Sequence, residues 1–424
     1  MIKRIKSLTN TEDKKRLLSN FFSLSILQGA NYILPLITLP YLVRVLGVEY
    51  FGLLAFANAT IAYFNILTDY GFNLTATREI SIHRDNKVKV TEIFSSVMTI
   101  KVILMFVSFL LLTILVFSFE KFHKDALVYF LTFGTVVGQV LFPVWFFQGM
   151  EKMKYITYLN ILAKSIFTVA IFIFVTKQSD FWIVPLLTSI GFIIAGIWSL
   201  YLVRKEFGIQ FTWQKTEHLK FYTAKAHSVF GSTVLSTIIS SFSVLMLGFF
   251  STNYNVGIYS AIEKIAKAIL SISNMSTQAL YPFISKKMKY SNVEGIYFLK
   301  NIFKYEFGFF LVVTIVLSLC GDSLLRVLYG TTVSQHANLL TLLLIWVLLC
   351  VINKYLGNLY LFSLGYFNLY LKDLFIASLL AGTAYIILIP SMVMYGIVYG
   401  MIIGELVLLI GMIFHIRKLN KKVK

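Results

Sequence analysis

The chain has 424 residues, of which 58% are hydrophobic and only 13% are charged, and its mean hydropathy is +0.79. A soluble protein of this length would carry roughly a quarter charged residues. The formal net charge of +19 could suggest a nucleic-acid partner, but the basic residues gather in short polar breaks between long apolar runs. The composition therefore excludes an ordinary soluble domain, argues against nucleic-acid binding and predicts a membrane protein.

Most of the apolar runs reach the ~20 residues that a helix needs to cross the hydrocarbon core of a bilayer. Backbone polar groups in lipid must be paired within each segment, so we expect helices, and the period-two alternation of a membrane barrel is absent. The sequence thus predicts an all-α polytopic membrane protein with about twelve transmembrane helices. The expected spans lie near residues 17–43, 50–73, 92–118, 124–148, 154–176, 181–203, 228–250, 255–285, 296–320, 336–362, 370–390 and 393–415.

The loops between these spans differ in charge from one side of the membrane to the other. One side carries the N-terminal tail with Lys3, Arg4 and Lys6, the C-terminal tail and most of the other basic residues. The opposite side has only Arg44, Lys121, Lys124, Lys177 and Arg326. By the positive-inside rule, both termini are expected in the cytoplasm, in agreement with an even helix count.

No cleavable signal peptide is expected, because the first apolar run is of spanning length and no small-residue cleavage site ends it. The two cysteines, Cys320 and Cys350, lie within or at the edge of apolar spans. Their spacing indicates neither a metal site nor a disulfide framework.

The longest cytoplasmic connection, residues 204–227, divides the predicted spans into two sets of six. An even number of spans gives both sets the same orientation, so we expect two six-helix lobes related by a pseudo-two-fold axis along the membrane normal. The predicted lobes are residues 1–210 and 211–424. The breaks after spans 1 and 7 are similar, since Gly52 and Gly257 each open the next helix.

The eighth predicted helix carries a polar stripe at steps of three and four residues. It consists of Ser260, Lys264, Lys267, Ser271, Asn274 and Gln278, which share one helix face. Lysines near the bilayer midplane each cost about 2.5–3.5 kcal/mol on insertion scales unless they meet water or a counter-charge. Glu263 can pair with Lys267, which leaves Lys264 available. The stripe is either an internal ion pair that locks helix packing or, in our preferred interpretation, the cationic wall of a water-filled cavity.

Other polar residues also lie inside predicted spans. Asn65 and Asp69 share a face of the second helix with Asn58, and Asn31 lies in the first. Lys101 lies near a cytoplasmic end, where its side chain could extend to the interface. Lys164, Lys354, Glu306 and Glu405 are further ionisable residues: Glu306 could pair with Lys300 or Lys304, and Glu405 has no local partner, so we expect it to be protonated or bridged to another helix.

The sequence has no Gly-x-x-x-x-Gly-Lys-[Ser/Thr] nucleotide loop, so this chain is not expected to hydrolyse ATP. Its loops are too short for a catalytic domain, and we expect no enzymatic activity and no cofactor. Transport would then draw on an ion gradient, on the membrane potential or on the gradient of the cargo.

Several motifs resemble those of Wzx-type polysaccharide flippases. Residues 39–47, LPYLVRVLG, followed by YFGL at 50–53, resemble the opening signature of that family. DYGFN at 69–73 with ATRE at 76–79 resembles the end of its second helix, and WFFQGMEK at 145–152 is similar to the stretch that closes its fourth. VGIYS at 256–260 with Lys264 is similar to the start of its eighth. The resemblance covers most of the chain and is strongest in the first 160 residues.

The resemblance implies membership of the multidrug/oligosaccharidyl-lipid/polysaccharide exporter superfamily, with a V-shaped fold of two alternating-access lobes in the bacterial inner membrane. Members move undecaprenyl-diphosphate-linked oligosaccharides, such as O-antigen units, from the cytoplasmic to the periplasmic leaflet. Membrane lipids, a polysaccharide polymerase and a chain-length regulator are the further partners that it implies, and Na⁺ or H⁺ is the expected coupling ion.

That cargo suits the cationic residues, because lysine and arginine are both phosphate partners. The hypothesis assigns diphosphate and sugar binding to Lys264, Lys267, Arg44, Lys354, Lys164, Asn31, Asn65 and Asn274. It assigns coupling or gating to Asp69, Glu263, Glu405 and Arg78. Arg44 and Arg78 lie near helix ends, where gate salt bridges or headgroup contacts are alternative roles.

Four alternatives remain open from the sequence. A multidrug exporter of the same superfamily would favour an acidic cavity for cationic drugs, and a lipid II flippase usually has two further helices. A membrane glycosyltransferase or polymerase needs a large loop with catalytic carboxylates. The last alternative is a membrane scaffold without a transport path.

Overall fold

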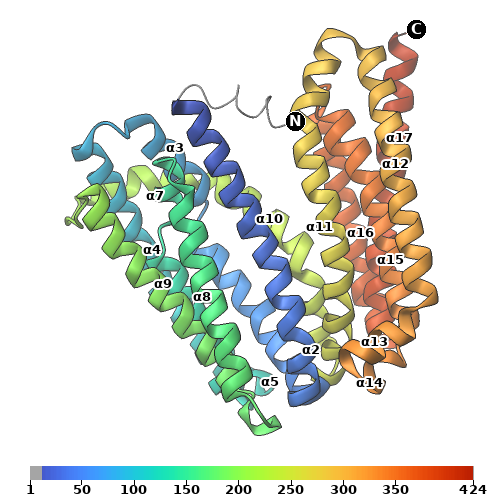
Figure 1. Cartoon of the computed structure of the whole chain (residues 1–424), viewed down its shortest axis with the longest axis horizontal. Coiled ribbons are helices and arrows are strands. Elements are labelled where there is room, and N and C mark those ends of the chain that lie inside the picture. The colour runs from blue at the N-terminus through green and yellow to red at the C-terminus, as the bar shows by residue number, and fades with distance from the viewer. Residues whose placement is uncertain (1–11, 424) are drawn as a thin grey trace. The chain divides into compact units, whose positions relative to one another are not determined.

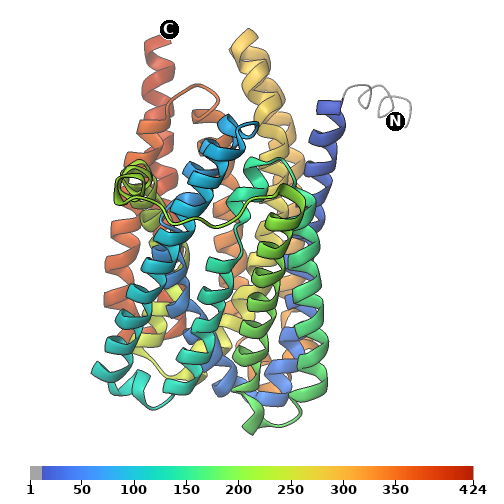
Figure 2. The same ribbon diagram turned by 90° about the vertical axis from the view of Figure 1, so that its left-hand side faces the viewer.

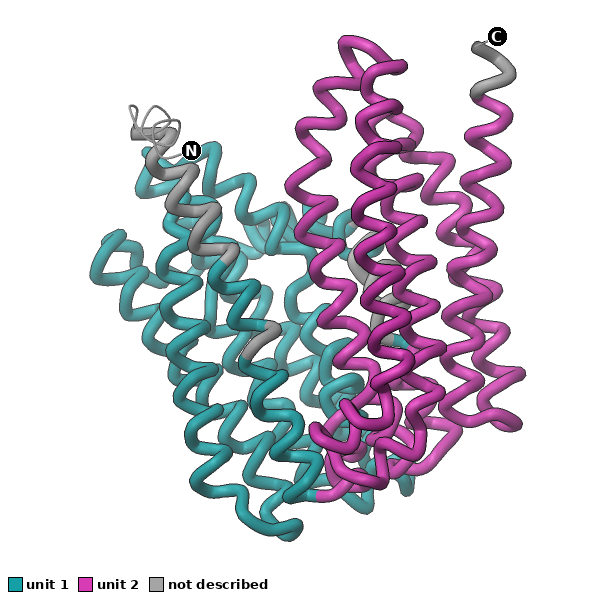
Figure 3. The backbone as a smooth tube through the Cα atoms, turned by 45° about the vertical axis from the view of Figure 1, so that its right-hand side comes forward, with its two compact units in different colours: residues 1–46, 56–242 teal, residues 47–55, 243–424 magenta. Residues whose placement is uncertain are grey.

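The structure is a computed structural model that describes residues 12–423, apart from the side chains of residues 12–25, 32–33, 228, 232–241 and 420–423. In the described part the regular structure is helical throughout (Figure 1). The chain forms two compact units, which Figure 3 shows in different colours.

The first unit comprises residues 1–46 and 56–242. Its helices are α2 (Glu12–Asp69), α3 (Phe72–His83), α4 (Lys87–Ser118), α5 (Glu120–His123), α6 (Ala126–Leu141), α7 (Val144–Gly149), α8 (Met153–Phe174), η1 (Gln178–Asp180), α9 (Ile183–Phe207) and the greater part of α10 (Thr216–Phe250). The second unit comprises residues 47–55 and 243–424. It contains the end of α10 and then α11 (Asn253–Tyr290), α12 (Asn292–Leu319), α13 (Gly321–Tyr329), α14 (Thr331–Ser334), α15 (Ala337–Lys354), η2 (Tyr355–Leu361), α16 (Phe367–Met392) and α17 (Met394–Val423).

The units divide inside α10, after Phe242, and not at residue 210 as the sequence predicted. The reason is the packing of the segment that follows α9. Ile209, Tyr222 and Ala226 are at most 4% exposed and belong to the same buried cluster as residues of α3, α4 and α7. Figure 2 shows the part of this segment between α9 and α10 crossing the first unit. Burial of these side chains therefore fixes the segment to the first unit.

Nine helical segments of the described residues are long and apolar enough to cross a membrane. Their outer faces expose large apolar side chains, among them Phe106, Leu110 and Phe117 of α4 at 60–66%. Apolar side chains of this size are stable on a surface that faces lipid. The chain is therefore a multi-pass membrane protein. The expected spans 228–250 and 255–285 lie in α10 and α11, which are outside these nine, so the count of twelve and the symmetry of the lobes stay predictions.

The first two expected spans lie mainly in α2, which contains Pro35 and Pro40 and consists of two helices that meet at a kink at Gly47. Gly47 has φ 77° and ψ 164°, a backbone conformation that glycine adopts without the steric cost that other residues meet. The break that the sequence places between spans 1 and 2 is therefore a kink at a single glycine rather than a loop.

The motifs of the first unit meet in its core. Trp145, Phe146 and Phe147 of α7 are fully buried, and α7 packs against α3. A Cβ atom at Gly149 would lie 2.6 Å from the Ile80 side chain, so only glycine allows this approach of the two helices. Thr77 Oγ1 donates to the Trp145 carbonyl oxygen at 3.2 Å. Residues of the motifs at 72–79 and 145–150 thus hold these two helices together.

Candidate functional site

The first unit contains a partly open polar cavity of about 440 Å³. A cavity of this size lies in the range that small-molecule sites occupy. Most of its lining side chains are polar, although the helices around it are apolar. The lining consists of Asn65, Ile66, Thr68, Asp69, Asn73, Lys101, Gln139, Phe142, Val144, Asn160, Lys164 and Phe192.

A tight turn between α2 and α3 brings two of these residues to the cavity. Asp69 ends α2, Tyr70 has φ 47° and Gly71 has φ 79°, and α3 begins at Phe72. Two successive residues of left-handed conformation end the helix and reverse the backbone. Asp69 and Asn73 therefore line the same cavity from either side of the turn. Tyr70 stacks on Phe230 of α10 with the ring centroids 4.4 Å apart, which fixes the turn in place.

Lys101 and Asp69 form an ion pair in the cavity wall, with 3.4 Å between Nζ and Oδ1. The Lys101 side chain is 5% exposed and the Asp69 side chain 23%. The sequence-based expectation that Lys101 extends to the interface was therefore wrong. α4 begins at Lys87, earlier than predicted, so Lys101 lies about four turns into the helix. A buried ammonium requires a counter-charge, and Asp69 supplies it.

Two further predicted residues meet at this cavity. Lys164 of α8 donates a hydrogen bond to Oδ1 of Asn31 on α2. Asn65 Oδ1 is buried and has no hydrogen-bond partner among the described residues. An unpaired buried acceptor beside two lysines leaves hydrogen-bonding capacity for water or for a polar ligand. The cavity can thus accommodate hydroxyl groups or an anionic group inside an otherwise apolar unit.

The predicted stripe on α11 contains the ion pair that its spacing indicated. Lys267 Nζ lies 3.0 Å from Glu263 Oε1. Glu263 is 2% exposed and also accepts hydrogen bonds from Tyr259 Oη at 3.0 Å and from Ser243 Oγ at 3.5 Å. This carboxylate joins neighbouring turns of α11 to the end of α10. It therefore has the helix-packing role that was one of the two interpretations of the stripe. Lys264 is exposed and forms no ion pair with any described residue.

The remaining predicted residues lie apart from these two groups. Glu405 of α17 is bridged to α15, where Asn353 Nδ2 donates to Glu405 Oε2 at 2.6 Å, and Lys354 ends that same helix. Arg78 is exposed and lies 3.6 Å from Glu79, Arg44 is exposed and Asn274 is half-buried. The sequence predicted that Glu405 would be either protonated or bridged to another helix, and the hydrogen bond with Asn353 is such a bridge.

The structure therefore groups the predicted residues in sets. Asn65, Asp69 and Lys164 line the polar cavity of the first unit, and Lys164 also contacts Asn31. Glu263 and Lys267 pair on α11, and Lys354 and Glu405 lie on adjacent helices of the second unit. Sequence reasoning missed Asn73, Gln139 and Asn160 in the cavity lining and misplaced Lys101. Gln139 and Asn160 are polar residues inside apolar spans, and this signal could have identified them.

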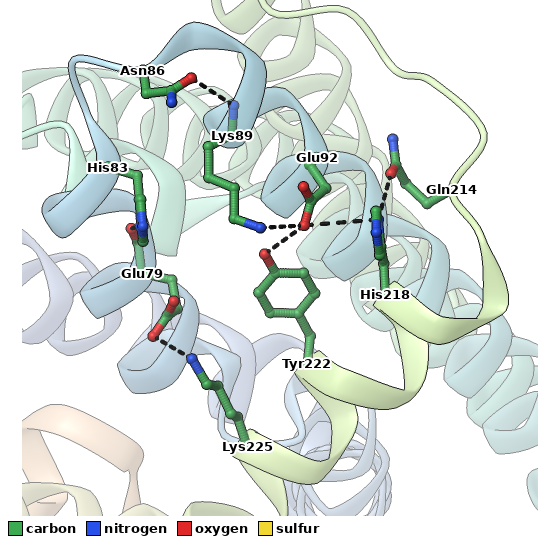
Figure 4. A network of polar contacts seen from close by, with 9 residues as sticks. All are labelled: Glu79, His83, Asn86, Lys89, Glu92, Gln214, His218, Tyr222 and Lys225. Carbon is green, nitrogen blue, oxygen red and sulfur yellow. Dashed lines mark hydrogen bonds and ion pairs between the residues drawn. The ribbon is translucent and has the colours of Figure 1, made fainter.

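A second polar group joins α10 to α3 and α4 (Figure 4). Glu92 Oε1 accepts hydrogen bonds from Lys89 Nζ at 2.7 Å and from Tyr222 Oη at 3.0 Å, and His218 Nδ1 lies 3.7 Å away. Lys225 Nζ lies 3.1 Å from Glu79 Oε1. Burial and the nearby Glu92 raise the pKa of the Tyr222 phenol, so this phenol stays protonated and remains a donor. The network holds the first turns of α10 against α3 and α4.

Two solved structures have a similar fold. The lipid II flippase MurJ in an inward closed conformation superposes with a TM-score of 0.71 at 12% identity, over 93% of this chain and 87% of that chain. An inward-facing multidrug resistance MATE family transporter of the MOP superfamily superposes with a TM-score of 0.68 at 14% identity, over 95% and 98%. At these identities the likeness shows a shared fold.

Sequence comparisons identify the family. The family model described as "Polysaccharide biosynthesis protein" matches residues 17–288. A protein of Escherichia coli (strain K12) named "Putative O-antigen transporter" is 36% identical over 68% of this chain and 70% of its own length. A protein of the same name from Shigella dysenteriae is 28% identical over 63% of this chain and 67% of its own. Both relatives are named as putative transporters. The chain belongs to their family of polysaccharide biosynthesis membrane proteins, the Wzx-type flippases, and is not an enzyme.

Proposed function

We propose that this protein is a flippase that moves undecaprenyl-diphosphate-linked oligosaccharide, of the O-antigen repeat type, from the cytoplasmic to the periplasmic leaflet of the bacterial inner membrane. The membership of the family supports the cargo class, because both relatives carry the name "Putative O-antigen transporter". The fold shared with a lipid II flippase supports the movement of a lipid-linked precursor. Both termini would lie in the cytoplasm.

The cargo sets the physical requirements. A diphosphate cannot cross ~30 Å of hydrocarbon unaided, because the transfer of its charge into lipid is strongly unfavourable. The transporter must therefore offer cations and hydrogen-bonding groups inside the membrane. The sugars need a hydrated polar path, whereas the prenyl chain is soluble in lipid and can remain there.

The polar cavity of the first unit is the observation that carries this proposal. It combines the ammonium groups of Lys101 and Lys164 with four amide side chains inside a unit whose outer faces are apolar. Lys101 is neutralised by Asp69, whereas Lys164 contacts only the neutral amide of Asn31 among the described residues. Lys164 is thus the cation of this cavity that can exchange its contact for a phosphate oxygen.

Each set of residues then has a role in the proposed cycle. Lys164, Lys264, Lys267, Lys354 and Arg44 attract the diphosphate, and Asn31, Asn65 and Asn274 contact sugar or phosphate oxygens. The carboxylates Asp69, Glu263 and Glu405, with Arg78, serve coupling or gating. The cycle proceeds by alternating access and is driven by an ion gradient or by the membrane potential, with the polymerase and the chain-length regulator acting on the delivered product.

Deletion of the gene in its native host tests the proposal. The deletion strain is expected to lose surface polysaccharide and to accumulate the undecaprenyl-diphosphate-linked oligosaccharide on the cytoplasmic leaflet. The wild-type gene should restore both, and the Lys164→Gln variant should fail to do so at a normal protein level. Unchanged surface polysaccharide in the deletion strain would refute the assignment, and increased drug sensitivity in its place would indicate a multidrug exporter.

A further inference from the structure

Amide side chains make up much of the polar lining of the cavity in the first unit. They are those of Asn65, Asn73, Gln139 and Asn160. All of them belong to helical segments that are long and apolar enough to cross a membrane. A polar residue in such a segment is costly to place in lipid and marks a functional site by default. Neither lysine of the cavity forms a hydrogen bond with these amides in the described structure. The amides therefore need an explanation of their own.

The protein leaves most of the hydrogen-bonding capacity of these amides unused. The side chains of Asn73 and Gln139 are exposed and form no hydrogen bond with any described residue. Asn65 Oδ1 is buried and also lacks a partner there. Asn160 Nδ2 donates to the carbonyl oxygen of Ile156 at 2.9 Å, and Asn160 Oδ1 accepts from no described residue. Because each amide has a donor nitrogen and an acceptor oxygen, the cavity presents both kinds of group to a ligand.

The charges of the lining supply only one cation to a diphosphate. Lys101 Nζ lies 3.4 Å from Asp69 Oδ1, which neutralises it. Lys164 is then the one lining ammonium without a carboxylate partner among the residues that the structure describes. The second oxygen of Asp69, Oδ2, accepts from no described residue, and its negative charge would repel a nearby phosphate oxygen. Apart from Lys164, the lining thus does not favour an anion.

A sugar hydroxyl matches this lining better than a phosphate oxygen does. An ionised phosphate oxygen accepts hydrogen bonds but has no proton to donate, so it leaves the oxygens of Asn65, Asn160 and Asp69 without a donor. A hydroxyl group both donates and accepts. It can donate to these oxygens and can accept from the amide nitrogens of Asn73 and Gln139. The volume of about 440 Å³ lies within the range of sites that bind small molecules. The lining therefore indicates a neutral ligand that is rich in hydroxyl groups.

We propose that this cavity binds a neutral sugar of the cargo's headgroup, and that Asn73, Gln139 and Asn160 determine which sugar is accepted. Lys164 supplies a single contact to a phosphate oxygen, and the rest of the polar lining holds the sugar. A site built to hydrogen-bond a hydroxyl group rejects an analogue that lacks it, because the polar groups of the site are then left unpaired. The role in transport rests on the proposed flippase function, whereas binding of the sugar does not.

Binding of soluble sugars to the purified full-length protein tests the site without any lipid-linked cargo. The protein is kept in a detergent that has no sugar group, and saturation-transfer NMR measures binding of the methyl glycosides of glucose, galactose, mannose and N-acetylglucosamine. At least one of these glycosides should bind the wild type. Gln139→Met and Asn73→Leu should each weaken that binding by about two- to tenfold, because each removes an amide that contacts the sugar.

Inorganic pyrophosphate separates a sugar site from an anion site. Binding of pyrophosphate, followed by phosphorus NMR, should be unchanged in Gln139→Met and Asn73→Leu and should be weakened in Lys164→Gln. Gln210→Met is the matched control for both probes, because Gln210 is an exposed glutamine of the first unit outside the cavity lining. This variant should bind the glycoside and pyrophosphate as the wild type does.

The stability of Asn65→Leu distinguishes a ligand contact from a structural role. Asn65 Oδ1 already lacks a partner in the described part of the chain, so an apolar side chain of similar size should not lower the unfolding temperature. Binding of the glycoside should nevertheless fall. A lower unfolding temperature with unchanged glycoside binding would contradict the place of Asn65 in the site.

Three results would overturn the sugar site. They are no binding of any glycoside by the wild type, equal binding by the wild type and both amide variants, and a loss of pyrophosphate binding in the amide variants. Glycoside binding that depends on Gln139 and Asn73, in a protein that moves no lipid-linked oligosaccharide in vesicles, would instead refute the flippase function and leave the sugar site in place.

Discussion

Gly52 and Gly257 lie against each other in the second unit. A Cβ atom on Gly52 would overlap the carbonyl oxygen of Asn253 and would lie 2.6 Å from the backbone nitrogen of Gly257. A Cβ atom on Gly257 would overlap the carbonyl oxygen of Val48. The contact is reciprocal. Gly257 lies four residues after Asn253, whose carbonyl oxygen faces Gly52, and Gly52 lies four residues after Val48, whose carbonyl oxygen faces Gly257. The sequence motifs around these two glycines are similar, as noted for the breaks after spans 1 and 7. The two backbones can approach this closely only because both positions are glycine.

Gly52→Ala and Gly257→Ala are each expected to destabilise the protein by about 1–3 kcal/mol or more, because a methyl group would meet backbone atoms that cannot rotate away. Thermal unfolding of the purified variants measures this effect. Gly308→Ala is the matched control, since no atom lies within 4 Å of a Cβ at this helical position. Equal unfolding temperatures for Gly52→Ala and Gly308→Ala would contradict the close packing.

The ion pair between Asp69 and Lys101 predicts a non-additive pair of substitutions. Asp69→Asn leaves a 5% exposed ammonium without its counter-charge, and loss of one member of a buried pair costs up to about 3–5 kcal/mol. Lys101→Met should cost less, because Asp69 is 23% exposed and can be hydrated. The double variant should regain part of the stability lost by Asp69→Asn. A double-mutant cycle of unfolding temperatures provides the measurement, and strict additivity would show that the two side chains do not interact.

Lys264 and Lys267 are three residues apart and should respond differently to removal of their charge. Lys267→Gln leaves Glu263, which is 2% exposed, without its cation, and should destabilise the protein by about 1–3 kcal/mol. Lys264→Gln should change stability by less than about 0.5 kcal/mol, because its side chain is exposed. It should nevertheless lower surface polysaccharide if Lys264 attracts the cargo. Full complementation by Lys264→Gln at a normal protein level would remove this lysine from the proposed path.

The network around Glu92 predicts a local effect on the segment before α10. Tyr222→Phe removes the hydrogen bond to Glu92, and Lys225→Met removes the ion pair with Glu79, each at a cost of about 1 kcal/mol. Weaker docking should expose the segment around Trp213, whose side chain is already 87% exposed. Limited chymotrypsin digestion should therefore cleave both variants faster at this position than the wild type.

The same digestion of Lys220→Met supplies the control. Lys220 is an exposed lysine in the first turns of α10, and its substitution should leave the cleavage rate unchanged. Equal rates for Lys220→Met and Lys225→Met would mean that the ion pair with Glu79 does not hold the segment.

The sequence predicted the helical membrane class correctly, because hydrophobic length is a local property of each segment. It also predicted the pair of Glu263 and Lys267, whose partners are four residues apart on one helix. The resemblance to Wzx-type flippases was confirmed by the family model and by the relatives. These features depend on residues that are close in the sequence or on motifs that are read directly.

Contacts between distant residues could not be predicted in this way. Lys101 pairs with Asp69 and Lys164 with Asn31 only because the helices bring them together. The boundary between the units lies in α10 because the side chains of Ile209 and Tyr222 are buried on the first unit. A pattern along one helix gives the face of each residue but not the neighbour that it meets.

Movement of the lipid-linked oligosaccharide in reconstituted vesicles tests the proposed function most directly. The oligosaccharide is extracted from the deletion strain and incorporated with the purified protein, and a membrane-impermeant lectin reports how much of it reaches the opposite leaflet. The wild type should transfer it faster than vesicles without protein, and Lys164→Gln should transfer it more slowly than the wild type. Equal transfer by wild-type vesicles and by vesicles without protein would contradict a flippase.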